Sequence, residues 1–289
     1  MRPQPAEPQP ALHWTSPPYR EARPLPPAAG AAPWHLPRGT VLVLDAGATP
    51  ADLLLLPDAV TDARRRFIGA ALVVRVAELT AATMGLAQRA ARLRVRAVIG
   101  PGEPSDEVLR PALTRPDDLG DDVVEWLALR GRPLSPVVAG LARQVVGQAH
   151  RFAQLGDLFA PLGESERTAR HRFRGKGLPP PSAWHQAGRA LHAALRIQAE
   201  PQARLSALAL ELGYADHSGF SRQLTRAFGV TPAAVRGTLG WEWLMERWMA
   251  RHGGHASAVT PASRARACEH WREPVATGSL RVHASGPTA

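Results

Sequence analysis

Arginine, histidine and serine side chains recur at helical spacing in two short stretches, a pattern suited to contacting nucleic acid. In the clearer stretch, a predicted helix from His217 to Phe228, one face carries hydroxyl and guanidinium groups. A guanidinium can bridge O6 and N7 of a guanine in the major groove, while hydroxyls contact phosphates or base edges. The candidate DNA-contacting residues of this helix are His217, Ser218, Ser221, Arg222 and Arg226.

The other stretch repeats the plan nearer the middle of the chain. Ser165 is placed to cap a helix in which Ala169 and Phe173 face inward. Its candidate DNA-contacting residues, at i, i+3, i+4 and i+7, are Arg167, Arg170, His171 and Arg174. Two residues depart from a regular copy: Pro161 falls in the last turn of the preceding helix, and Arg172 takes a position that is usually apolar.

Each of these helices needs a partner helix and a turn to hold it. For the clearer copy we expect a leading helix over residues 205–212, a turn at 213–215, Asp216 as N-cap, and a stop at Gly229. Phe220, Leu224 and Phe228 fall at i, i+4 and i+8 and predict its buried stripe.

For the first copy we expect a leading helix over residues 152–162 and a turn at 163–164. A connecting helix over residues 182–199 joins the two copies and is roughly 27 Å long at 1.5 Å per residue. That length could hold two reading helices about one DNA turn apart, roughly 34 Å, on one face of the duplex.

The clearer copy resembles a known family. The stretch from Leu212 to Arg222, followed by Phe228 to Pro232 and by Arg236, is similar to the second helix-turn-helix signature of AraC/XylS-type transcription regulators. Leu224 and Val235 stand where that family often has aromatic residues. The resemblance covers about residues 150–237, and it implies sequence-specific binding to promoter DNA by two recognition helices in successive major grooves.

The charge distribution agrees with a nucleic-acid partner in this region. The chain of 289 residues has a formal net charge of +10, but residues 1–140 carry 16 basic and 15 acidic side chains, a net of +1. Residues 141–240 carry 13 and 6, a net of +7, and residues 241–289 carry 6 and 4. Phosphate neutralisation by such cations is the main sequence-independent source of DNA affinity, so the DNA-binding region is expected at 141–240.

The N-terminal part predicts a different fold class. We expect a disordered proline-rich arm over residues 1–38, followed by an α/β domain over residues 39–135. Strands are expected at 41–44, 71–76 and 95–99, with helices at 51–66 and 80–93 between them, which gives a small parallel βαβ sheet. The element order faintly resembles a degenerate receiver domain of the flavodoxin-like type.

The chemistry of a working receiver is missing from this sequence. Asp45 stands without a second carboxylate at a strand end, and the only lysine, Lys176, lies outside the region. The glycines near residue 100 do not form a phosphate-binding loop. We therefore expect no catalytic residues, no cofactor and no phosphorylation. The single cysteine, Cys268, excludes an intramolecular disulfide, and the spacing of the C-terminal histidines matches no standard zinc site.

The whole chain is thus expected to combine an α/β domain with an all-α double helix-turn-helix domain. The predicted ranges are 1–38 for the arm, 39–135 for the receiver-like domain, 136–150 for a linker helix, 151–240 for the DNA-binding domain, and 241–289 for an amphipathic helix and a disordered tail.

The predicted function is a transcription regulator of the bacterial cytoplasm or nucleoid, without a membrane segment, whose partner is double-stranded promoter DNA. RNA polymerase and a second copy of the chain are further candidate partners. Two alternatives stay open: a DNA-tethered protein-interaction module without a small-molecule effector, and an enzyme using the α/β domain.

Overall fold

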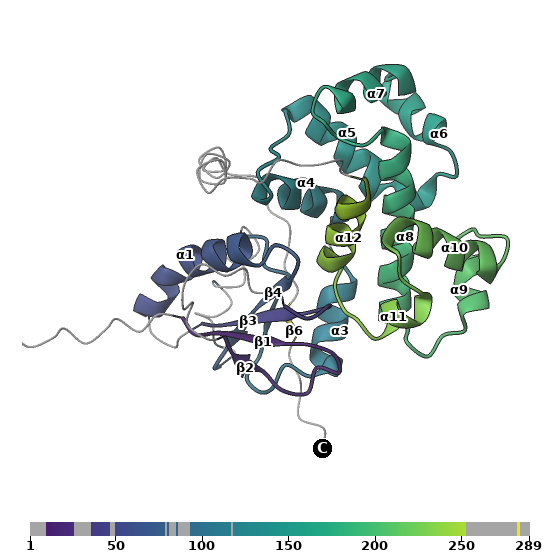
Figure 1. The fold of residues 1–289 in the computed structure, drawn as a ribbon. Helices are drawn as coiled ribbons and strands as arrows, with labels where there is room; N and C mark the ends of the chain where they lie inside the picture. Colours follow the sequence, from purple (N-terminus) through teal and green to yellow (C-terminus); the bar gives the residue numbers. More distant parts are fainter. Residues whose placement is uncertain are drawn as a thin grey trace, which may run out of the picture. The chain divides into compact units, whose positions relative to one another are not determined.

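The structure is a computed structural model, and it describes residues 10–25, 36–46, 50–78, 80, 85, 93–116, 118–252 and 282–283. The chain divides into two compact units, with the change between Leu113 and Thr114 (Figure 1). The first unit is a sheet with helices, and the second is entirely helical in its described part. This division comes earlier than the boundary predicted near residue 135, because the helix Leu119–Leu129 between the two positions packs within the helical unit.

The first unit is built on a mixed sheet with the strand order β2-β1-β3-β4-β5-β6. The strand bounds are β1 (Leu12–Thr15), β2 (Arg23–Pro24), β3 (Val41–Ala46), β4 (Ala71–Val76), β5 (Ala97–Ile99) and β6 (Val282–His283). Strands β3, β4, β5 and β6 pair in parallel, whereas β1 pairs antiparallel with both β2 and β3. The three predicted parallel strands are confirmed.

The flavodoxin-like arrangement is not confirmed. In that arrangement the first parallel strand lies between the second and the third. Here β4 lies between β3 and β5, so the parallel strands follow their order in the sequence. The other side of β3 is taken by β1, which comes from the N-terminal segment.

That position of β1 corrects the prediction of a disordered arm over residues 1–38. Within the described residues 10–25, β1 pairs with β3 from Leu12 opposite Leu44 to Thr15 opposite Val41. Tyr19 is buried, and its hydroxyl donates to the carbonyl oxygen of Gly39 at 2.9 Å. A strand of four residues is too short to show the alternation of apolar and polar residues that identifies strands in a sequence. Its conformation depends on pairing with β3, which comes later in the chain.

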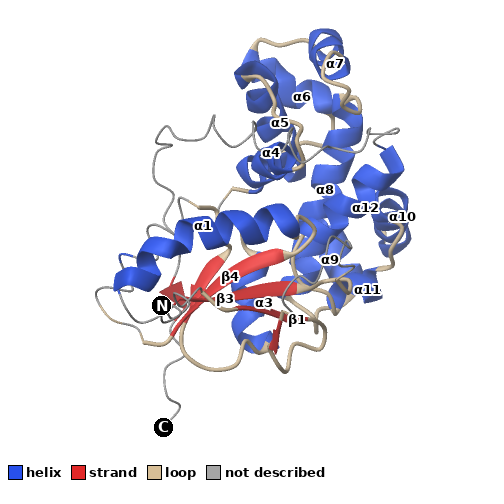
Figure 2. Ribbon diagram, turned by 60° about the vertical axis from the view of Figure 1, so that its left-hand side comes forward, coloured by secondary structure: helices blue, strands red, loops and turns tan. Residues whose placement is uncertain are grey.

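Helix α1 (Pro50–Arg66) lies across one face of the sheet (Figure 2) and contacts β3 and β4. Leu42, Leu44 and Val74 form part of the buried core on which α1 packs through Val60. Val43 and Val73, which alternate with them along the strands, are also fully buried. Both faces of these strands are therefore covered, as is usual for parallel sheets. Helix α3 (Asp106–Thr114) follows β5.

Asp45, near the end of β3, forms an ion pair with a residue of the neighbouring strand. The Arg75 side chain donates to both of its carboxylate oxygens, from Nε at 2.6 Å and from Nη2 at 2.9 Å. This hydrogen bond to Asp45 raises the pKa of Arg75. The bidentate pair joins the ends of β3 and β4, which is a structural role. Of the helix predicted over 80–93, only residues 80, 85 and 93 are described.

The second unit surrounds one long helix, α8 (Pro181–Ala199), which packs against α5, α7, α10 and α11. The other elements, in chain order, are α4 (Leu119–Leu129), α5 (Pro136–Gly147), the 3-10 helix η1 (Ala149–Arg151), α6 (Leu155–Phe159), the 3-10 helix η2 (Ala160–Leu162), α7 (Glu166–Arg174), α9 (Leu205–Glu211), α10 (His217–Phe228), α11 (Pro232–Arg236) and α12 (Glu242–His252). The predicted linker helix corresponds to α5 and η1, and it is part of this core because it packs on α4 and α8. Among the described residues, no helix has the length and apolar character needed to cross a membrane.

Candidate nucleic-acid interface

Helices α9 and α10 form the clearer helix-turn-helix, with the turn at residues 212–216. The backbone of Gly213 has φ of 75°, a left-handed conformation that glycine adopts without strain. The carboxylate of Asp216 accepts from the backbone N–H of Gly219 at 2.6 Å, which caps α10 and lowers the pKa of Asp216. Tyr214 and Phe220 pack with ring centroids 5.0 Å apart, which fixes α10 against the turn. The predicted start of α10 is confirmed.

Helix α10 buries one face and exposes the other. Phe220, Leu224 and Phe228 are fully buried, as their spacing predicts. On the opposite face His217, Ser218, Arg222 and Arg226 are exposed and Ser221 is half-buried. This face is therefore available to a partner along the whole helix, and neither Arg222 nor Arg226 has an ion pair within the described part of the chain.

The C-terminal end of α10 is held by α12. Gly229 ends the helix in the left-handed conformation with φ of 66°. Arg247 donates to the carbonyl oxygens of Phe228 and Gly229, at 2.7 and 3.2 Å, and Arg251 donates to that of Thr225 at 3.3 Å. Carbonyls at a helix C-terminus lack intrahelical partners, and cations there also interact favourably with the helix dipole. Two arginines of α12 therefore fix the last turn of α10.

The first helix-turn-helix consists of α6, η2 and α7. The predicted leading helix over 152–162 is shorter in the structure, because the α-helix ends at Phe159 and a 3-10 turn containing Pro161 follows. Gly163 makes the turn with φ of 61°. The hydroxyl of Ser165 accepts from the backbone N–H of Thr168 at 3.1 Å and caps α7, as predicted.

Helix α7 presents a face rich in arginine. Ala169 and Phe173 are fully buried, and the four candidate residues Arg167, Arg170, His171 and Arg174 are all exposed. Arg172, at the position that is usually apolar, is half-buried and forms an ion pair with Glu164 in the turn. The ion pair explains why a charged residue occupies this position. The Arg172 side chain does not pack in the core but links α7 to the turn that precedes it.

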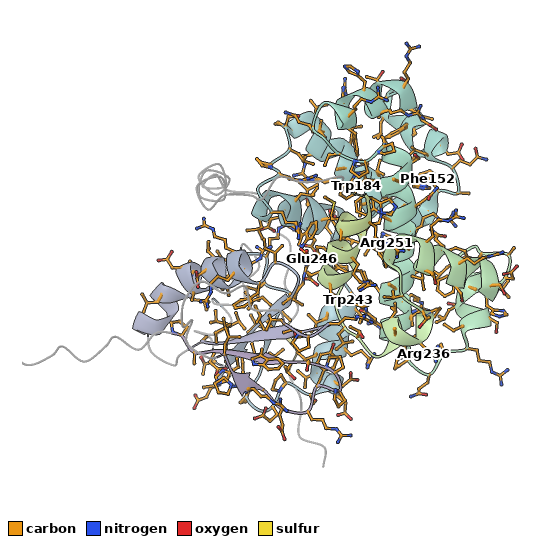
Figure 3. All side chains as sticks on the ribbon, in the orientation of Figure 1. Phe152, Trp184, Arg236, Trp243, Glu246 and Arg251 are labelled. Carbon is orange, nitrogen blue, oxygen red and sulfur yellow. The ribbon has the colours of Figure 1, made fainter. Side chains whose placement is uncertain are left out.

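Helices α7 and α10 rest on the same support. Helix α8 contacts α7 near one motif and α10 near the other, and it spans 19 residues, which is roughly 28 Å. Trp184 of α8 packs edge-on against Trp248 of α12 with ring centroids 4.4 Å apart. The buried amide of Gln198 donates to the carbonyl oxygen of Gly240 at 3.0 Å. Figure 3 labels Trp184 on α8 together with Glu246 and Arg251 on α12.

An amphipathic helix is expected within residues 241–289, and α12 lies there and packs on α10. Arg247 and Arg251 are not among the residues singled out from the sequence, although both donate to carbonyl oxygens at the end of α10. The sequence feature that could have identified Arg247 and Arg251 is their spacing of four residues, which places both on one face of a helix.

In the described ranges, no group of three or more histidine, cysteine or acidic side chains could hold a metal ion. His255, Cys268 and His270 lie outside those ranges. The candidate interface therefore depends on guanidinium, imidazole and hydroxyl groups.

Comparison with known proteins agrees with this geometry. Residues 158–238, from α6 to α11, match the family model described as a helix-turn-helix domain. The searches against curated proteins and against solved structures found no match. The matched range begins at the end of α6 and includes α7, the connecting helix α8, and the second motif with α9 and α10. Residues 158–238 are an AraC-type helix-turn-helix domain, the DNA-binding domain of transcription regulators.

Proposed function

We propose that α7 and α10 enter two successive major grooves of one promoter site. The observation that carries this proposal is the shared support: α7 and α10 both pack on α8, and each turns a polar face to solvent. A support roughly 28 Å long is compatible with two reading helices about one helical turn of DNA apart, roughly 34 Å.

The two helices are expected to contribute differently. The exposed face of α10 combines His217, Ser218 and Arg222, whose varied donors and acceptors suit the reading of base edges. The exposed face of α7 carries three arginines and one histidine, which suits phosphate contacts as well as guanine. We infer that α10 supplies most of the sequence specificity and α7 most of the salt-dependent affinity.

The first unit would then connect DNA binding to another signal or protein. Its strand-end carboxylate Asp45 is engaged by Arg75, which argues against a phosphorylation switch. RNA polymerase and a second copy of the chain are the candidate partners for such a connection. Sedimentation of the full chain with and without promoter DNA would identify a dimer by its mass.

Footprinting on sites found by genome-wide mapping tests the two-groove proposal. Hydroxyl-radical cleavage of a bound promoter should show two protected patches about one helical turn apart. Arg170→Ala on α7 should weaken protection of one patch and Arg222→Ala on α10 that of the other. A single patch, lost only in Arg222→Ala, would show that α7 does not enter a groove.

A further inference from the structure

The helical unit contains a cavity of about 380 Å³ away from the polar faces of α7 and α10. It is lined by the segment before α4, by the end of α5 with η1, and by the second half of α8. We call it the α5–α8 pocket; the charged and imidazole side chains among its described lining residues are Arg115, Asp118, His150, Arg151, His192 and Arg196. Its volume equals that of about a dozen water molecules, which suits a small metabolite.

Two of the arginines in the α5–α8 pocket have no counter-ion among the residues that the structure describes. Arg196 pairs with Glu200 at 2.5 Å and with Glu211 at 3.2 Å, so its charge is already compensated. Arg115 and Arg151 are exposed and make no ion pair with any residue that the structure describes. An anion in the cavity could therefore meet two guanidinium groups without displacing an existing ion pair.

The acidic residue among the described lining residues, Asp118, does not cancel the positive charge of these arginines. Asp118 is the N-cap of α4, where its carboxylate accepts from the backbone N–H of Asp121 at 2.9 Å. A carboxylate in that position is held by the helix terminus, and the helix dipole partly offsets its charge. The described lining thus has a surplus of positive charge.

Two neutral histidines add hydrogen-bonding groups on the same wall. The rings of His150 and His192 lie 4.2 Å apart, and Nε2 of His192 is 3.1 Å from the carbonyl oxygen of Val146. Burial, helped by the nearby His150, lowers the pKa of His192 to about 4, and burial also lowers that of His150. Both imidazoles are uncharged at neutral pH, so they can bind a polar ligand without repelling each other.

We propose that the α5–α8 pocket binds a small anion that carries phosphate or carboxylate groups. The pocket is lined by three separate segments of one unit, so a small ligand can contact all three at once. The bound anion would bridge Arg151 beside α5 and the α8 wall at His192, and Arg115 would close the third side. Promoter binding by α7 and α10 is not needed for this site, so the two proposals can fail separately.

Titration of the full chain with inorganic phosphate and with citrate tests the site. Binding is followed by calorimetry and by the histidine ring signals in NMR, at an ionic strength kept constant with chloride. We expect saturable binding, tighter for citrate than for phosphate, with shifts of two histidine signals. Losing one charge-assisted contact in Arg151→Ala should weaken binding about tenfold or more, and Arg115→Ala should act in the same direction.

Arg132→Ala is the matched control, because Arg132 lies between α4 and α5 in the same unit but does not line the pocket. It should leave the phosphate and citrate affinities unchanged, and Arg151→Lys should retain part of the binding. Circular dichroism confirms that each variant is folded. The proposal would be overturned if all variants weakened binding equally or if binding never saturated. It would also be overturned if an unrelated DNA duplex displaced the phosphate.

Discussion

Arg247 on α12 donates from Nε to the carbonyl oxygen of Phe228, the last residue of α10, at 2.7 Å. Helix α12 begins at Glu242, after the matched helix-turn-helix domain has ended at residue 238. A second link runs from Arg130 on α4 to Glu246, on the same helix as Arg247. Helix α10 is therefore supported by a segment that the family match does not include.

Removing this support should destabilise the helical unit measurably. Arg247→Ala deletes a charge-assisted hydrogen bond at a half-buried helix end, so the free energy of unfolding should fall by about 1–2 kcal/mol. Arg251 is exposed and its contact is longer, so Arg251→Ala should cost at most about 0.5 kcal/mol. Urea unfolding curves with unchanged m-values measure both. Equal effects of the two substitutions would contradict the assignment.

Gly229 and Gly163 offer a matched pair of helix-turn positions. Both are left-handed, with φ of 66° and 61°, so alanine at either should cost about 1–2 kcal/mol of backbone strain. A Cβ on Gly229 would also lie 2.0 Å from Nη1 of Arg251, whereas nothing lies within 4 Å of one on Gly163. Gly229→Ala should therefore lower the melting temperature more than Gly163→Ala does. A smaller or equal shift would show that Arg251 moves aside at no cost.

Two arginines of α10 should differ in how their loss affects DNA binding. Arg222→Ala should weaken binding to the cognate promoter by about 1–3 kcal/mol and relax specificity at one base pair. Arg226, near the C-terminal end of α10, is expected to meet phosphate, so Arg226→Ala should weaken all sequences alike and reduce the salt slope by about 1. Fluorescence anisotropy on cognate and altered duplexes measures both. Unchanged affinity in Arg222→Ala would refute its reading role.

The stability of the helical unit should fall in mild acid because of His192. Its pKa is about 4 in the folded chain and about 6.5 when unfolded, so the unfolded state binds more protons between these values. Stability is unaffected by this group above pH 6.5, and it declines by up to about 1.4 kcal/mol per pH unit as pH falls toward 4. His192→Gln should flatten this dependence in chemical denaturation series. An unchanged slope in that variant would assign the acid sensitivity to other groups.

The helix-turn-helix region could be predicted closely because its signals are local. The stripe of Phe220, Leu224 and Phe228, the Asp216 cap and the Gly229 stop each act within one or two helical turns. The bounds of α10 follow from them, and the start of α7 follows from the Ser165 cap. Pro161 shortened the preceding helix, as its missing N–H predicts.

The first unit was predicted less well because its sheet depends on distant pairing. The sequence indicated three strands but not their order, and β1 was hidden in a proline-rich segment. Asp45 was correctly seen as lacking a second carboxylate, yet nothing local showed that Arg75, thirty residues later, would pair with it.

The sequence by itself determined that residues 141–240 carry a basic double helix-turn-helix, since periodicity, capping and charge are properties of neighbouring residues. Only the tertiary structure decided that α12 caps α10, that Arg172 pairs with Glu164, and that Arg115 and Arg151 line one cavity with two histidines. These contacts join residues that are distant along the chain or face each other across a turn. Their geometry depends on the packing around α8, which no local pattern specifies.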